Sequence, residues 1–466
     1  MVGIYLAAAH KSSGKTTLTI GLSAAFTRQG ANVQTFKKGP DYIDPLWLSK
    51  ASGNPCYNLD FYVDSEQEIL NRFHTHAVNK DLSLIEGNKG LYDGLSLDGT
   101  DSNAALAVLL GLPVILVIDC TGITRGIAPL LLGYKEFQTP RVNFAGVILN
   151  KVAGARHEAK LVNSVEEYTD FNLLGALGKS SDLMIEERHL GLIPSNESKD
   201  VTEFIQRLAT RVGQSVDLSQ ISTIASGVEA IVHKPPKKAT VKAAKSDLTI
   251  GVAQDEAFGF YYQSDIDEFV RLGARLQYFS IVHDKALPKI DGLFLGGGFP
   301  ETHMDKISAN SRILNDLAKK IDQGLPVYAE CGGMMILAKS LYWQGKKVPM
   351  ANVIKADCVM SAKPCGRGYV RLQPTEVHPW VLTKNALEIK AHEFHYSQLE
   401  KFTADYEYAY TVVRGTGIKD QQDGLVYKNL LTNYAHLKSS TQFSWIDGFL
   451  RFCRGVKARR NSKQKP

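Results

Sequence analysis

The sequence predicts two α/β domains, the first built on a parallel β-sheet, and three observations lead to this prediction. Over residues 1–210, short apolar runs alternate with segments of helical periodicity, as they do in open parallel sheets. The alternation resumes at residue 248 after a stretch of different composition. At 466 residues the chain is also too long for one ordinary hydrophobic core, so two domains are expected.

The first domain begins with a strand that is directly followed by a helix. Its strands are expected at 4–8, 33–37, 82–86, 114–119, 144–149 and 173–177. Its helices are expected at 15–28, 103–110, 127–137 and 156–168, with a closing helix at 201–212. In a parallel sheet of this kind, the active crevice lies at the carboxyl ends of the strands.

Residues 213–247 separate the two domains. They are rich in Ser, Ala and Lys, and the run HKPPKK at 233–238 cannot lie inside a regular helix or strand. We expect a domain at 1–215, a linker at 216–247, a second domain at 248–450 and a tail at 451–466. In the second domain, strands are expected at 248–252, 276–279, 292–295 and 326–329, helices at 265–272, 311–323 and 334–341, and mostly strands over 350–430.

The composition indicates a soluble, cytoplasmic protein. Hydrophobic residues make up 44% and charged residues 22% of the chain, as in ordinary globular proteins. The longest apolar run, 104–118, is broken by Gly111 and Pro113 and is too short to span a bilayer. No export signal is recognisable at the N-terminus. Six cysteines without paired spacing argue against a zinc site or a disulfide framework and fit a reducing compartment.

The net charge of +6 comes from the C-terminal tail. Residues 451–466 hold seven Lys and Arg residues and no acid, so the rest of the chain is close to neutral. A near-neutral body does not indicate nucleic-acid binding, and the tail is expected to be a solvated, disordered end. The sequence leaves the oligomeric state open, with a homodimer as one option.

A phosphate-binding loop lies at 9–16, with the sequence AHKSSGKT. It matches the pattern G-x-x-x-x-G-K-[ST], except that Ala9 replaces the first glycine with a residue nearly as compact. Its place between an apolar strand and a helix lets backbone N–H groups and the helix dipole hold phosphate. A chance Ser/Gly turn before a helix is the alternative. The expected ATP ligands in this loop and helix are Ser13, Gly14, Lys15, Thr16 and Thr17.

Two polar loops follow strands that neighbour the phosphate loop. One has the sequence KKGPDYIDP at 37–45, and the other has the sequence EGNKGLYDG at 86–94. Lys37 is expected to complete the ATP site by neutralising phosphoryl charge. Gly-Pro-Asp and Asp-Gly are also common turn formers, so each loop has an ordinary structural explanation as well. The candidate Mg²⁺ ligands are the oxygen donors Thr16, Asp41 and Glu86.

The second domain carries a cysteine in a glycine-flanked turn, AECGG at 329–333. An apolar strand ends just before Cys331 and a helix is expected just after it, which predicts a strand-to-helix elbow. In such an elbow the helix N-terminus lowers the pKa of the thiol, and adjacent N–H groups can bind an oxyanion. A lone cysteine is more often a buried structural residue, but the flanking glycines argue against that. The expected oxyanion donors are the backbone groups of Gly297, Gly298 and Gly332.

A thiol nucleophile also needs a base. The candidate histidines are His378, His392, His395 and His436. Their spacing does not select one of them. His392 and His395 also form a His-x-x-His pair, but no third metal ligand lies near them in the sequence.

With these motifs, the chain resembles the cobyrinic acid a,c-diamide synthase family, glutamine-dependent amidotransferases that act on corrin precursors. The resemblance covers nearly the whole chain. Besides the phosphate loop, the two polar loops and the ECGG turn, it rests on ERHLGLIP at 187–194, GGGFPE at 296–301 and HEFHYS at 392–397. Together these motifs are highly specific to the family.

The resemblance implies both fold and chemistry. Residues 1–215 resemble a P-loop NTPase-like synthetase domain related in fold to dethiobiotin synthetase, and residues from 248 onward resemble a class I glutamine amidotransferase domain. The resemblance implies that Cys331 is the nucleophile and that His436 activates it. It implies ATP, Mg²⁺ and glutamine as the ammonia donor, with a tetrapyrrole as the acceptor. Roles in substrate, metal or intermediate handling are implied for Asp41, Tyr42, Ile43, Glu86 and Asp93.

Three departures from the family pattern bear on the acceptor. Family members usually read His-Leu-His-Phe where this chain has HLKS at 436–439, and a small residue and Met where it has Asn88 and Lys89. The basic tail is also unusual. Similar loops occur in the sirohaem-amidating branch, so sirohaem is an alternative acceptor to cobyrinic acid. Amidation of the cobyric acid synthase type is a further alternative, against which the PDYIDP segment argues.

A rival of another class is a partitioning-type ATPase, which shares the phosphate-loop fold. The signature lysine of those proteins follows the first loop position, where this chain has His10. They also have no use for Cys331, so the cysteine turn favours the enzyme.

Overall fold

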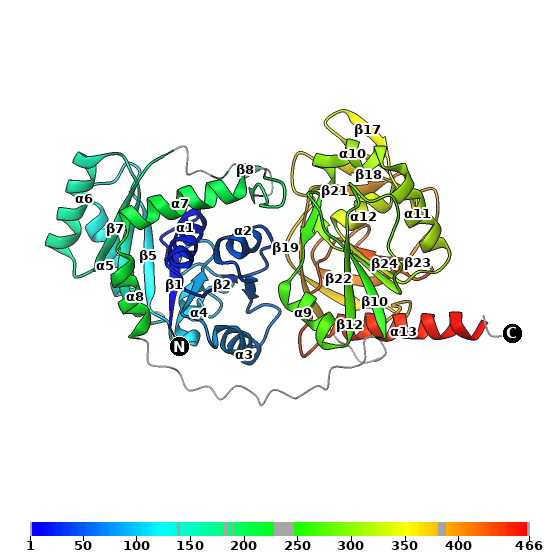
Figure 1. Ribbon diagram of the computed structural model, residues 1–466, viewed down its shortest axis with the longest axis horizontal. Helices are drawn as coiled ribbons and strands as arrows, with labels where there is room; N and C mark the ends of the chain where they lie inside the picture. The colour runs from blue at the N-terminus through cyan, green and yellow to red at the C-terminus, as the bar shows by residue number, and fades with distance from the viewer. Residues whose placement is uncertain are drawn as a thin grey trace. The chain divides into compact units, whose positions relative to one another are not determined.

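The computed structural model describes residues 2–137, 140–180, 185, 187–188, 191–198, 200–227, 247–380 and 388–463. The chain forms two compact units, Met1–Lys238 and Ala239–Pro466. Each is an α/β unit with its own sheet (Figure 1). Within the described ranges, no helix combines the length and apolar character that crossing a bilayer requires.

The first unit is built on a seven-stranded, fully parallel sheet with the order β3-β2-β4-β1-β5-β6-β7. Its carboxyl ends therefore lie at one edge, which brings the loops after β1, β4 and β2 next to one another. The strands are β1 (Gly3–Ala8), β2 (Val33–Lys38), β3 (Tyr57–Leu59), β4 (Leu82–Glu86), β5 (Val114–Asp119), β6 (Phe144–Val152) and β7 (Leu173–Gly178).

Helices cover both faces of this sheet. The buried side chains of β1 alternate between two clusters, because Leu6 packs on one face and Tyr5 on the other. The Leu6 face is covered by α1 (Lys15–Arg28), α2 (Ile43–Ser52), α7 (Val201–Ser215) and α8 (Leu218–Ser226). The Tyr5 face is covered by α3 (Glu66–Ala77), α4 (Asn103–Leu110), α5 (Ile127–Glu136) and α6 (Ala155–Tyr168). A short pair, β8 (Glu187–Arg188) and β9 (Gly191–Leu192), completes the strands described in this unit.

The second unit is built on a nine-stranded mixed sheet. Its order is β12-β10-β13-β15-β24-β23-β22-β19-β20, parallel from β12 to β24 and antiparallel from there on. The strands are β10 (Leu248–Ala253), β12 (Ala274–Phe279), β13 (Gly292–Leu295), β15 (Val327–Glu330), β19 (Gly366–Pro374), β20 (Ile389–His395), β22 (Glu407–Arg414), β23 (Gln422–Tyr427) and β24 (Leu430–Asn433). The parallel part again gathers loops at one edge.

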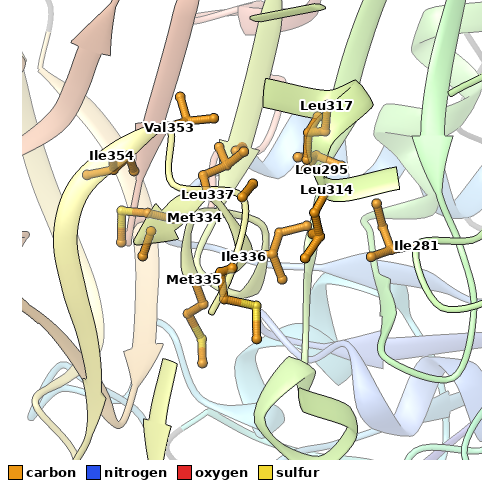
Figure 2. Packing of buried hydrophobic residues seen from close by; sticks show 14 of the residues in the cluster. Ile281, Leu295, Leu314, Leu317, Met334, Met335, Ile336, Leu337, Val353 and Ile354 are labelled. Atoms are coloured by element: carbon orange, nitrogen blue, oxygen red, sulfur yellow. The ribbon is translucent and has the colours of Figure 1, made fainter. Parts of the chain in front are cut away.

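Smaller elements surround this sheet. A four-stranded sheet consists of β17 (Lys346–Pro349), β16 (Ala338–Trp343), β18 (Ile354–Met360) and β21 (Ser397–Glu400), and β11 (Phe258–Phe260) pairs with β14 (Gly297–Gly298). The helices are α9 (Gln263–Arg271), a 3₁₀ turn (Pro300–His303), α10 (Met304–Ala309), α11 (Ser311–Asp322), α12 (Gly332–Leu337) and α13 (Trp445–Lys463). Met334 to Leu337 of α12 are buried in the same hydrophobic cluster as Leu295, Leu314 and Leu317, with Met334 on the side of Val353 and Ile354 (Figure 2). This packing fixes the turn that precedes α12.

Three expectations need correction. The helix expected at 334–341 ends at Leu337, because Ala338–Trp343 pairs with β17 and β18 as strand β16. Residues 218–226, expected in the linker, form α8, whose first turn is capped by Asp217 and whose Leu218, Ile221 and Ala225 are buried. Residues 451–463, expected as a disordered tail, continue α13. The run at 233–238 lies outside the described residues.

Candidate active sites

The phosphate loop has the geometry that its sequence predicts. It joins β1 to α1, with Ser12 and Gly14 at positive φ angles of 64° and 85°. A Cβ on Gly14 would lie 2.1 Å from Nδ2 of Asn150, so only glycine fits there. The Asn150 amide donates to the Ser13 carbonyl at 2.8 Å, and the Tyr134 hydroxyl donates to the Ala9 carbonyl at 2.6 Å. These bonds hold loop carbonyls, while the first N–H groups of α1, including that of Thr17, have no partner within the helix.

Lys15 links the phosphate loop to the loop that follows β4. Its Nζ donates to the Lys89 carbonyl at 2.6 Å, and its side chain is buried. Burial and the nearby charge of Lys37 lower the pKa of Lys15 to about 8. The ammonium group of Lys15 therefore lies at the N-terminus of α1 and loses its proton at a lower pH than an ordinary lysine.

An acidic cluster lies beside Lys15 and consists of Thr16, Lys37, Asp44 and Glu86. Nζ of Lys37 contacts Oδ2 of Asp44 at 2.5 Å and Oε1 of Glu86 at 2.6 Å. The Thr16 hydroxyl donates to the same Glu86 oxygen at 2.6 Å and to Asp44 at 3.2 Å. The parallel pairing of Lys37 with Glu86 on neighbouring strands produces this convergence.

The acidic cluster places one ammonium group, that of Lys37, against the two carboxyl groups of Asp44 and Glu86. Burial alone would lower the pKa of Lys37, but Asp44 and Glu86 outweigh it and raise that pKa. Burial raises the pKa of Glu86, and its Oε2 is fully buried without a hydrogen-bond partner among the described residues. A bare carboxylate oxygen beside a threonine hydroxyl is a donor set that suits Mg²⁺. The residues present thus fit a divalent cation at Glu86.

Asp41, which the sequence predicts as a metal or acceptor contact, is engaged in a structural contact. Its Oδ1 accepts from the N–H groups of Ile43 at 2.9 Å and of Asp44 at 3.0 Å, so it caps the start of α2. Its Oδ2 lies 3.9 Å from Nζ of Lys37. Burial and the charge of Asp44 raise the pKa of Asp41 to about 7. Tyr42 lies at the N-cap of α2 and Ile43 is its first residue.

The loop after β4 is held in a closed turn. The Asn103 amide donates to the carbonyls of Asn88 at 2.5 Å and Gly90 at 2.6 Å, and its oxygen accepts from the Asn88 N–H at 3.0 Å. Asp93 accepts from the Gly90 N–H at 2.8 Å through Oδ2. Lys89, with φ 42°, is exposed. The turn therefore presents the side chain of Lys89 to solvent beside the phosphate loop.

Cys331 occupies a strained strand-to-helix elbow. Its φ and ψ are 45° and −100°, which is unusual for a residue with a Cβ, and 8% of its surface is exposed. Its N–H donates to the Asn433 carbonyl at 2.8 Å, and its carbonyl accepts from Met335 N–H at 3.0 Å. The thiol therefore stands at the N-terminus of α12, as the sequence predicts.

The glycine loop expected to bind an oxyanion lies against this elbow. A Cβ on Gly332 would lie 3.0 Å from the backbone nitrogen of Gly298, and one on Gly297 would lie 2.7 Å from Cε1 of His436. Gly297 and Gly298 belong to β14, which pairs with β11. The N–H region of Gly298 and Gly332 thus adjoins both Cys331 and the imidazole.

His436 is the candidate base that contacts Cys331. A hydrogen bond joins the two side chains, and Nδ1 of His436 lies 3.1 Å from Oε2 of Glu330. Burial by itself lowers the pKa of His436, but its bonds to Cys331 and Glu330 and their charges raise it to about 10. These two contacts therefore favour the charged form of the imidazole.

Two of the other three histidines are hydrogen-bonded elsewhere. His378 pairs with the Tyr410 hydroxyl at 2.9 Å, and His395 pairs with the Ser397 carbonyl at 2.8 Å. His392 exchanges backbone hydrogen bonds with His436, and burial lowers the pKa of its imidazole to about 3.

Sequence reasoning missed Asp44 and Glu330. Both stand inside motifs that it had singled out, Asp44 three residues after Asp41 and Glu330 directly before Cys331. Their contacts follow from strand pairing, which places Lys37 opposite Glu86 and Glu330 opposite Asn433. The motif composition was the available signal, because an acid next to a nucleophile is a candidate partner for its base.

Comparisons with known proteins agree with this geometry. Residues 249–442 match the CobB/CobQ-like glutamine amidotransferase domain, and residues 4–193 match the CobQ/CobB/MinD/ParA nucleotide binding domain. The predicted fold class and the predicted glutamine-dependent ligase type are thereby confirmed.

Whole-chain relatives carry the comparison further. The chain is 39% identical to a cobyrinate a,c-diamide synthase of Magnetococcus marinus, over 97% of both chains. It is 38% identical to that of Dehalococcoides mccartyi, over 96% of this chain and 97% of the relative, and 36% identical to that of a Synechocystis species, over 97% and 93%. With this identity across both units, the chain belongs to the cobyrinate a,c-diamide synthase family.

Proposed function

We propose that this protein amidates peripheral carboxylates of a modified tetrapyrrole, converting cobyrinic acid to cobyrinic acid a,c-diamide with ATP and glutamine. The observation that carries the proposal is the contact of Cys331, His436 and Glu330 at the amidotransferase elbow. The relatives named for cobyrinate support the choice of acceptor.

In the second unit, the Cys331 thiolate attacks the side-chain amide carbon of glutamine. The backbone region of Gly297, Gly298 and Gly332 binds the oxyanion of the tetrahedral intermediate. His436 gives its proton to the leaving nitrogen, so that ammonia departs and a thioester remains. Water, deprotonated by His436, then hydrolyses the thioester to glutamate and restores the thiol.

In the first unit, the phosphates of ATP bind at Ser13, Gly14, Lys15, Thr16 and Thr17. Lys15 and Lys37 neutralise charge that develops when an acceptor carboxylate attacks the γ-phosphorus and ADP leaves. Mg²⁺, held by Thr16 and Glu86 with Asp41 nearby, would neutralise further phosphate charge. Ammonia then attacks the acyl phosphate, phosphate departs and an amide forms.

The acceptor is the part of the proposal that rests on the loops at 37–45 and 86–94. Asp41, Tyr42, Ile43 and Asp93 are the proposed acceptor or intermediate contacts. Lys89 is exposed beside Lys15 and adds a cation that could meet an acceptor carboxylate. Because Asn88 and Lys89 also depart from the small residue and Met that are usual in the family, sirohaem stays a second candidate acceptor.

Mass spectrometry of the products tests the proposal. The purified protein, ATP, Mg²⁺ and glutamine are incubated with cobyrinic acid or with sirohaem. Each amidation exchanges one OH for NH₂, so two successive losses of that mass difference from cobyrinic acid support the diamide synthase. If only sirohaem is amidated, sirohaem and not cobyrinic acid is the acceptor. If neither compound is amidated, the proposed function is wrong.

A further inference from the structure

We propose that Glu330 positions His436, so that the imidazole presents its reactive nitrogen to Cys331. The inference deepens the proposed glutaminase chemistry and rests on it. Glu330 is the last residue of β15, and its neighbour in the chain is the nucleophile itself. Its carboxylate nevertheless reaches the base, because Glu330 pairs with Asn433 on β24 and His436 follows shortly after that strand.

The carboxylate is held from both sides. Oε2 lies 3.1 Å from Nδ1 of His436, while Oε1 accepts from the Tyr328 hydroxyl at 2.6 Å and from the Leu437 N–H at 2.9 Å. The side chain is 3% exposed, so water does not compete freely for these oxygens. Glu330 therefore has no freedom to turn away from the imidazole.

These contacts dictate the state of the imidazole. An ionised carboxylate can only accept hydrogen bonds, so Nδ1 of His436 must carry a proton. In the neutral ring, Nε2 then has its lone pair available to the thiol, and in the charged ring Glu330 balances the imidazolium.

A further bond extends the arrangement. The Asn433 amide donates to the Tyr328 hydroxyl at 3.3 Å, and Tyr328 donates to Glu330. Burial and the charge of Glu330 raise the pKa of Tyr328, which keeps its hydroxyl a donor. The chain Asn433–Tyr328–Glu330–His436 thus ends at Cys331.

Glu330→Gln reverses the hydrogen-bond polarity at one atom. Tyr328 and Leu437 both donate to Oε1, so the amide oxygen of the glutamine must occupy that position. The amide nitrogen then faces Nδ1 as a donor and favours the tautomer with the proton on Nε2, which cannot accept from the thiol. We expect kcat for glutamine hydrolysis to fall roughly 10²- to 10⁴-fold with little change in KM.

Two variants separate positioning from support of the fold. Glu330→Asp keeps the charge and is expected to recover part of the lost kcat. Asp357→Asn is the control, because Asp357 is a buried acid of the same unit, on β18, that accepts from the Ser340 hydroxyl at 2.6 Å. We expect it to leave the pH profile of glutamine hydrolysis unchanged.

A second measurement does not need glutamine turnover. The rate of alkylation of Cys331 by iodoacetamide, followed by peptide mass spectrometry against pH, reports the thiolate fraction. In Glu330→Gln the midpoint is expected to rise by about one pH unit or more, because the imidazolium beside the thiolate loses its counter-charge.

The outcomes are distinguishable. A Glu330→Gln protein with kcat within about threefold of the parent and an unshifted alkylation midpoint would overturn the positioning role. A parent protein without glutamine hydrolysis would instead overturn the proposed function, and the alkylation midpoint would still decide whether Glu330 acts on His436 and Cys331.

Discussion

The two candidate sites differ in how far the chain itself completes them. At the cysteine elbow, both oxygens of Glu330 have hydrogen-bond partners and the imidazole contacts both Glu330 and Cys331. In the acidic cluster, by contrast, Oε2 of Glu86 is buried without a partner among the described residues. A buried bare carboxylate oxygen costs free energy that a bound cation would recover.

The two sites therefore differ in how far they are organised before a ligand binds. The cysteine elbow is organised before its substrate arrives, which suits a site that only has to release ammonia. The acidic cluster uses Lys37 as an internal counter-charge, and Oε2 of Glu86 is the oxygen that the proposed Mg²⁺ would contact. Four variants or conditions can break or sharpen this comparison.

The largest effect is expected from Cys331→Ala. Loss of the Cys331 thiol should reduce glutamine-dependent amidation by at least about 10⁴-fold, because the nucleophile that forms the thioester is gone. Amidation with a high concentration of ammonium salt should persist. Both rates are measured by mass spectrometry of the tetrapyrrole.

Cys365→Ala is the control for Cys331→Ala. Cys365 is more exposed than Cys331 and lies outside the elbow. Strands β16 and β18 separate the two cysteines along the chain. Full glutamine use by Cys331→Ala would disprove the nucleophile.

The next effect is expected from Lys15→Ala. Without this ammonium group at the helix N-terminus, synthesis should fall roughly 10³-fold with glutamine or ammonia alike. Glutamine hydrolysis should continue, since it needs no phosphate loop. Lys11→Ala, an exposed lysine in the same loop, is the control. Retained amidation in Lys15→Ala would rule out the proposed phosphate contact.

A smaller effect is expected from Glu86→Gln. The neutral amide is a weaker cation ligand than a carboxylate, so the Mg²⁺ concentration for half-maximal synthesis should rise roughly 10- to 100-fold. Titration of ammonia-dependent synthesis with MgCl₂ measures this. Glu66→Gln, on the exposed first turn of α3, serves as the control. An unchanged Mg²⁺ requirement would place the cation elsewhere.

The sequence predicted the parts of the molecule that depend on local patterns. The phosphate loop and the cysteine elbow were both predicted because glycine, lysine and cysteine at fixed spacing carry their geometry with them. α3 was missed although Ser65 and Glu68 form a capping box that its sequence displays. The sequence therefore contains a signal that predicts this helix.

Other features needed the sheet. The apolar run at 334–338 suits a helix that continues further along the chain, and only pairing with β17 and β18 makes residues 338–343 a strand. The roles of Asp44 and Glu330 depend on which strands are neighbours. The residues alone left the choice between His436 and His392 open, because that choice depends on strand pairing as well. Side-chain contacts across strands come from tertiary pairing, which spacing along the chain does not encode.

The smallest expected effect is a difference in pH dependence between the two sites. Lys15 has a pKa lowered to about 8, so its charge is complete below that pH and is lost as pH rises through it. The value of kcat/KM for ATP should therefore fall above about pH 8, at a fixed concentration of free ammonia. His436 has a pKa raised to about 10, so glutamine hydrolysis should extend to higher pH. Lys15→Arg should remove the fall, because arginine stays charged. A flat pH profile of kcat/KM for ATP between about pH 7 and 9 in the parent protein would show that the pKa of Lys15 does not control ATP use. The contrast with the cysteine elbow would then rest on Glu86 alone.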